Sequence, residues 1–266
     1  MSVTTAAMAT STDGASGLRE ALLWCAARVV AVALAVAAAT ALVAAIGLET
    51  AFPPTPLIAS LALIPVNLIT LWAVRRRVRR DGGTLRTLLG FDRSRLGRDA
   101  LWAVLWIAVL YVPFCLAVVG TMFALHGADA FDRFETVFVP TVTPGFPTAV
   151  AVVLGLVVVA TFAPLNAPAE EALFRGVAQG ALARAGRPVL AVALPAVAFG
   201  VQHLFFAPGP DAMVVYAVAF LFWGIGSGLI AARQRRLMPL VLAHALVNLL
   251  TTLPAALLPL LIPEAS

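Results

Sequence analysis

Long apolar runs alternate with short polar segments along this chain. Seven of the runs reach about the 20 residues that an α-helix needs to cross a lipid bilayer. They cover residues 21–47, 55–74, 100–125, 149–169, 188–206, 212–232 and 238–261. The pattern predicts an all-α fold, a polytopic transmembrane helix bundle with about seven spans.

The composition agrees with a membrane protein. Apolar residues make up 62% of the chain and charged residues 12%, against about 45–50% and 25% in soluble domains. The net charge of +5 comes from arginines beside the apolar runs, so we expect a lipid bilayer, and no nucleic acid, as the partner of this charge. Cys25 and Cys115 lie inside apolar runs and are predicted to be unpaired.

The distribution of arginine predicts the orientation. Nine arginines lie between the second and third runs, and more follow the fourth and sixth runs, whereas the alternate loops are mainly acidic. Because positively charged loops stay in the cytoplasm, we expect a multi-pass protein of the plasma (inner) membrane. Its N-terminus would be cytoplasmic and its C-terminus outside.

Three regions follow from this reading. Residues 1–16 are small and polar and are predicted to form a disordered N-terminal tail. Residues 17–147 would hold the N-terminal transmembrane helices and a basic cytoplasmic loop, with the side chain of Arg28 reaching the membrane interface. Residues 148–261 would form a helical core that contains the polar motifs. The first run is longer than a signal-peptide core, so we expect it to be retained, with cleavage as an alternative.

The most informative motif is Glu170-Glu171 followed by Arg175. Ionisable groups at membrane depth are costly and by default mark a functional site. Residues four apart share a helix face, so Glu171 and Arg175 are predicted to pair while Glu170 faces another helix. Pro164 and Pro168 are expected to kink the helix just before the carboxylates, and Asn166 could cap a restarted helix.

Two later runs supply partners. One places Phe199 and His203 four residues apart, on one helix face, and the other does the same for His244 and Asn248. The ordered set Glu-Glu-x-x-x-Arg, Phe-x-x-x-His and His-x-x-x-Asn resembles the CAAX-protease and bacteriocin-processing family of intramembrane endopeptidases. The similarity covers roughly residues 148–252, so the region 148–261 would be a CAAX-protease-like catalytic core.

The resemblance implies hydrolysis of a peptide bond in a membrane-associated peptide or protein, without a cofactor. It implies that Glu170 acts as a base together with His203. His244 and Asn248 would stabilise the oxyanion, and the supporting residues would be Glu171, Arg175 and Phe199.

Residue chemistry is compatible with these roles. A carboxylate and a histidine that share one water can activate it as a nucleophile, and a second histidine and an amide can donate to an oxyanion. Counting 1.5 Å per residue from the predicted cytoplasmic ends places Glu170 and His203 about 20 Å deep, but His244 only about 9 Å deep. Helix tilt would have to bring them together. Removing the charge of Glu170 is expected to leave the fold intact.

Several alternatives stay open at the level of sequence. Glu170, His203 and His244 have the composition of a His₂Glu catalytic zinc site, although there is no His-Glu-x-x-His motif. The same residues could relay protons in a proton-coupled transporter, or the chain could be a non-enzymatic, immunity-type membrane protein. The residues interpreted as simple bridges between helices are Asn67, Asn166 and Gln202.

Overall fold

The computed structural model describes residues 3–261, with side chains from residue 14 onward, and all regular elements in that part are helical. This confirms the all-α prediction. The longer helices are α1 (Val3–Ala45), α2 (Pro56–Arg80), α4 (Leu96–His126), α6 (Thr148–Glu170), α8 (Pro188–Gln202), α9 (Pro210–Gln234) and α10 (Met238–Leu261). The shorter ones are α3 (Leu85–Leu89), η1 (Arg93–Arg95), η2 (Gly127–Ala130), α5 (Phe134–Phe138), η3 (Glu171–Ala178), α7 (Gln179–Arg184) and η4 (His203–Phe206).

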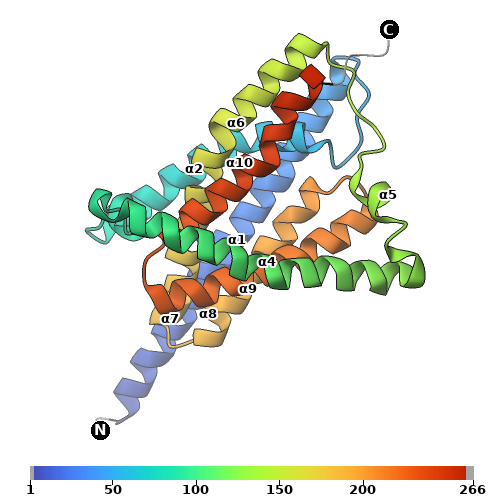
Figure 1. Ribbon diagram of the computed structural model, residues 1–266. Helices are drawn as coiled ribbons and strands as arrows, with labels where there is room; N and C mark the ends of the chain where they lie inside the picture. The colour runs from blue at the N-terminus through green and yellow to red at the C-terminus, as the bar shows by residue number, and fades with distance from the viewer. Residues whose placement is uncertain (1–2, 262–266) are drawn as a thin grey trace.

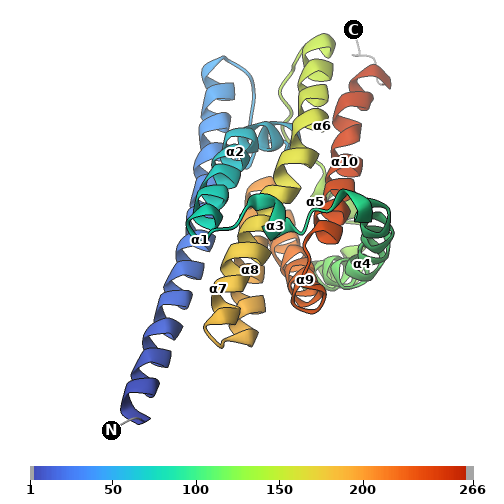
Figure 2. The same cartoon turned by 90° about the vertical axis from the view of Figure 1, so that its left-hand side faces the viewer.

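Within the described residues, seven helical segments are long and apolar enough to cross a membrane. Each predicted run falls on one of them, which confirms the predicted number of spans. Helices α2, α8 and α9 begin with proline, whose fixed φ and missing N–H suit the first turn of a helix. The start of α1 and the end of α10 lie at opposite ends of the molecule, as an odd number of spans requires (Figures 1 and 2).

Helix α6 packs against both α2 and α10. Helix α1 packs against α2 and α8, and α9 packs against α8 and α4. Helix α4 runs across the bundle at a steep inclination to α1, α6 and α10 (Figure 1). The helices are therefore far from parallel, which matters for the depth of each polar residue.

Small residues allow two of these helix pairs to approach closely. A methyl group on Gly155 of α6 would lie 2.4 Å from the backbone oxygen of Ala255 in α10, and one on Gly224 of α9 would lie 2.8 Å from Cα of Ala196 in α8. Both separations are too short for non-bonded atoms, so only glycine fits. This is the small-residue packing typical of membrane helices.

The N-terminal segment differs from its prediction. Helix α1 begins at Val3, so residues 3–16 are helical rather than a disordered tail, while residues 1 and 2 lie outside the described part. Extending an existing helix adds one hydrogen bond per residue without the cost of a new nucleus, and this favours continuation of the long α1.

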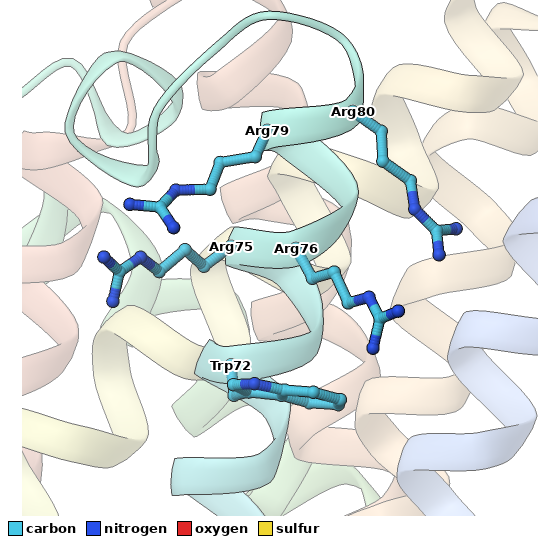
Figure 3. Close-up of a pocket in the computed structure, with 5 residues that line it drawn as sticks. All are labelled: Trp72, Arg75, Arg76, Arg79 and Arg80. Atoms are coloured by element: carbon cyan, nitrogen blue, oxygen red, sulfur yellow. The ribbon is translucent and has the colours of Figure 1, made fainter.

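The end of α2 carries a dense basic cluster. Trp72, Arg75, Arg76, Arg79 and Arg80 line a surface cavity of about 530 Å³. Their guanidinium groups spread to two sides of the last turns of the helix (Figure 3). The guanidinium of Arg76 lies 5.5 Å from the ring centre of Trp72. Tryptophan beside arginine at the end of a span is typical of a membrane interface.

Cysteine labelling tests the predicted orientation. In a background with Cys25 and Cys115 replaced by alanine, we expect Arg93→Cys to be protected in intact cells from a membrane-impermeant maleimide. Asp132→Cys, on the opposite set of loops, should react, and both positions are exposed. Both sites should react after the membrane is permeabilised. Labelling of Arg93→Cys but not of Asp132→Cys in intact cells would reverse the assignment.

Candidate active site

The two adjacent glutamates lie where α6 passes into η3, an eight-residue π-helix. Pro168 has no N–H with which to continue the α-helical hydrogen bonds, and the wider π turns begin three residues later. Single π turns inside helices are frequent at functional sites. The predicted restart of a helix at Asn166 is wrong, because Asn166 lies inside α6 and its side chain accepts a hydrogen bond from Arg28 instead.

Glu171 and Arg175 form the predicted pair. The Nη1 of Arg175 lies 3.3 Å from Oε1 of Glu171, and both side chains are buried. Arg175 also donates to Oγ of Ser227, and its guanidinium lies 4.5 Å from the ring centre of Phe199. Phe199 therefore supports the pair, and Ser227, which also donates to the backbone oxygen of Trp223, serves as a link between helices.

His244 lies between the two carboxylates. Its Nδ1 is 3.0 Å from Oε1 of Glu171, and its Nε2 is 3.7 Å from Oε2 of Glu170. Because a carboxylate oxygen accepts hydrogen bonds, Nδ1 carries the proton that Glu171 receives. This contact fixes the imidazole ring so that Nε2 faces Glu170.

The structure corrects the depth estimate for His244. Counting along each helix suggested that His244 lies nearer the cytoplasmic surface than Glu170, yet the two side chains are in contact. A count along the chain equals depth only for helices parallel to the membrane normal that start at the same level. Helix α10 begins well inside the bundle, whereas α7, which continues α6 and η3, reaches further toward the end where α1 begins, so the two counts start at different levels (Figures 1 and 2).

Glu170 is 2% exposed and has one oxygen engaged. Its Oε1 accepts from Nη2 of Arg28 at 2.9 Å, which is also an ion pair. Its Oε2 has no hydrogen-bond partner in the part of the chain that the structure describes. Glu170 thus faces away from the Glu171–Arg175 pair, as predicted, and one carboxylate oxygen remains available.

His203 is held by its own helix end. Its Nδ1 donates to the backbone oxygen of Phe199 at 2.6 Å, and its ring stacks on Phe220 at 3.5 Å between ring centres. These contacts leave Nε2 without a proton in the neutral ring. His203 and Glu170 form no direct ion pair within residues 3–261, so a shared water remains a prediction.

One cavity of about 400 Å³ joins the three motifs. Its polar lining includes Glu170, His203, His244 and Asn248. Asn248 is 7% exposed, and its Nδ2 has no hydrogen-bond acceptor among the described residues. The aromatic lining consists of Tyr111, Phe114, Phe138, Phe162, Phe199, Phe206, Tyr216, Phe220 and Trp223. The site is therefore a small polar patch in an apolar chamber.

The residues proposed for zinc do not gather into a metal site. Among the side chains described, those of residues 14–261, no three His, Cys, Asp or Glu groups are placed to hold one ion. Glu170 is also neutralised by a guanidinium, which would oppose a second cation at the same carboxylate.

Sequence reasoning missed Arg28. It was expected to extend to the membrane interface, but its side chain is fully buried and bonds to groups on three other helices, so that prediction is wrong. Its partners include all three residues interpreted as bridges, Asn67, Asn166 and Gln202. The available signal was an arginine inside an apolar run, together with uncharged polar residues in three other runs.

The buried pair predicts a stability effect. Arg175→Ala would leave the Glu171 carboxylate without its cation and lower the free energy of unfolding by about 3–5 kcal/mol. Thermal unfolding of the detergent-purified protein measures the change. Arg184→Ala, at an exposed position on the same helical segment, is the matched control and should have little effect. Equal melting temperatures for Arg175→Ala and the wild type would contradict the role given to this pair.

Comparison with known proteins supports the assignment of the motifs. Residues 149–250 match the family model described as Type II CAAX prenyl endopeptidase Rce1-like. No curated protein and no solved structure matches the chain. The matched segment contains all three motifs and confirms the family resemblance drawn from them. The family that residues 149–250 of this chain resemble is therefore the Rce1-like type II CAAX prenyl endopeptidases.

Proposed function

We propose that this chain is an intramembrane endopeptidase that hydrolyses a peptide bond in a membrane-associated peptide or protein. Membership of the Rce1-like family implies an intramembrane protease. The observation that carries the proposal is the single cavity lined by side chains from all three motifs, Glu170, His203, His244 and Asn248. The proposed reaction uses these side chains and water, and it assigns no step to a metal or other cofactor.

Glu170 and His203 are the groups that would activate water. Oε2 of Glu170 has no hydrogen-bond partner in the described residues, and neutral His203 has an unprotonated Nε2. A water held between two acceptors can give up a proton while its oxygen attacks the carbonyl carbon. The same proton would pass to the leaving amine as the C–N bond breaks.

Asn248 and His244 would stabilise the oxyanion. Nδ2 of Asn248 is a buried donor without an acceptor among residues 3–261. The Nδ1 proton of His244 is already bonded to Glu171, so His244 can donate from Nε2 only as an imidazolium. The Glu171 carboxylate, 3.0 Å from Nδ1, would balance that charge in the reaction. Glu171 would therefore support the oxyanion site through His244.

The substrate follows from the walls of the chamber. Nine of the residues that line the cavity are aromatic, and they suit the apolar end of a peptide that reaches the site from the lipid. We place the protein in the plasma (inner) membrane with a cytoplasmic N-terminus, on the basis of its arginine-rich loops.

Glu170→Gln tests the proposed base. Glutamine cannot take up a proton, so cleavage should slow by about 10² or more. The ion pair with Arg28 also changes the expectation that the fold stays intact, because Glu170→Gln leaves a buried guanidinium without its anion. Glu170→Asp keeps the charge but retracts the carboxylate, and it should also be slow. Quantitative proteomics of new N-termini in membranes of each strain measures the loss of cleavage products.

Glu135→Gln is the matched control, since Glu135 is an exposed carboxylate, and its product profile should equal that of the wild type. Wild-type levels of every membrane cleavage product in the Glu170→Gln and Glu170→Asp strains would end the proposed mechanism. Products that disappear in the Glu170 variants but not in the control identify the substrate.

The other motif residues have graded effects. His203→Ala should be about as inactive as Glu170→Gln, and the double variant little worse, because residues that act as one unit are not additive. Asn248→Ala should raise the barrier by about 2.7–4 kcal/mol, which is the usual effect of losing one oxyanion donor. Rates with an internally quenched peptide that spans the identified cleavage site measure both. Multiplicative losses in the Glu170/His203 double variant would show that the two residues act separately.

A further inference from the structure

Arg28 lies outside the segment that matches the family and yet bonds to its first glutamate. It belongs to α1, its side chain is fully buried, and its Nη2 lies 2.9 Å from Oε1 of Glu170. The matched segment begins only at residue 149. The N-terminal part of the chain therefore contributes a charged group to the candidate site.

The guanidinium is held from several directions at once. Its Nε donates to Gln202 of α8 at 3.4 Å, and its Nη1 donates to Thr70 of α2 at 3.0 Å. Its Nη2 is shared among Asn67 at 2.8 Å, Asn166 at 3.2 Å and Glu170. All five acceptors are buried, and they come from three helices other than α1. The planar guanidinium group of Arg28 is thus fixed in orientation as well as in position.

We infer that Arg28 is a positioning residue for the proposed base. By holding Oε1 of Glu170, it sets the carboxylate so that Oε2 is left facing His244 and the cavity. It also supplies the positive charge that a buried carboxylate requires. The inference rests on the proposed function, because it gives Arg28 a role in the reaction of the same site.

A lysine could replace the charge but not the geometry. The guanidinium offers five N–H groups in a rigid plane, and the ammonium group offers three on one freely rotating atom. A displacement of about 1 Å at a catalytic group can cost about 10²-fold in rate. The reaction should therefore distinguish arginine, lysine and a neutral side chain at position 28.

The test compares Arg28→Met, Arg28→Gln and Arg28→Lys, with rates given per folded molecule on the quenched peptide described above. In the neutral variants, kcat should fall by about 10²-fold with KM within about threefold of the wild type. The kcat of Arg28→Lys should be about tenfold higher than that of the neutral variants. Arg184→Met is the control, because Arg184 is an exposed arginine outside this hydrogen-bond network, and its kcat should stay within about threefold.

A purely structural role predicts a different pattern. A folded neutral variant with wild-type kcat would overturn the inference, and so would Arg28→Lys no faster than Arg28→Gln. If neither neutral variant folds, the kcat of Arg28→Lys is the deciding measurement. A wild-type kcat in that variant would show that the planar guanidinium is not needed and would overturn the inference. Inactive Glu170 variants together with an active Arg28→Met protein would refute only this inference. Wild-type activity of the Glu170 variants would refute the proposed function itself.

A measurement without substrate tests the contact. Arg28→Met should lower the melting temperature in the wild-type background, because it strands the Glu170 carboxylate. In the Glu170→Gln background the same change should lower it much less or raise it, since both charges are then gone. Equal effects of Arg28→Met in the two backgrounds would show that the two side chains are not coupled and would overturn the inference.

Discussion

The structure depends on the pairing of charges in a chain that is otherwise apolar enough to lie in lipid. Two adjacent carboxylates, Glu170 and Glu171, are buried, and each has a guanidinium partner within hydrogen-bond distance. Uncompensated charges in such surroundings would cost several kcal/mol each. The two arginines make the cluster neutral, and His244 can lie between the carboxylates without adding an isolated charge.

This pairing also determines which helices meet. Arg28 joins α1 to α2, α6 and α8, while Arg175 and His244 connect η3 to α9 and α10. The chamber touches both sets of contacts, because Glu170 and His244 line it together with aromatic side chains. Side chains fixed on helices by several bonds are held more accurately than side chains on loops, which suits a site that must orient a water and a peptide bond.

The π-helical segment explains how one helix serves both sets. Glu170 is the last residue of α6, and Glu171 is the first residue of η3. The change in helical geometry lies between adjacent residues that face different partners, Arg28 for the first and Arg175 with His244 for the second. Pro164 and Pro168 come just before this change and have no N–H for the helical ladder. The change from α-helical to π-helical turns therefore coincides with the two carboxylates.

Much of this protein could be predicted from its sequence. Long apolar runs have few alternatives to spanning helices, because backbone polar groups must be satisfied within the segment in lipid. The Glu171–Arg175 pair depends only on local helix geometry, and the motif order pointed to the family whose model residues 149–250 match. Tertiary structure alone decided the partner of Glu170, the contact of His244 with both carboxylates and the burial of Arg28. These contacts join residues up to 174 positions apart and depend on how the helices are placed against one another, which hydrophobic pattern and residue spacing do not encode.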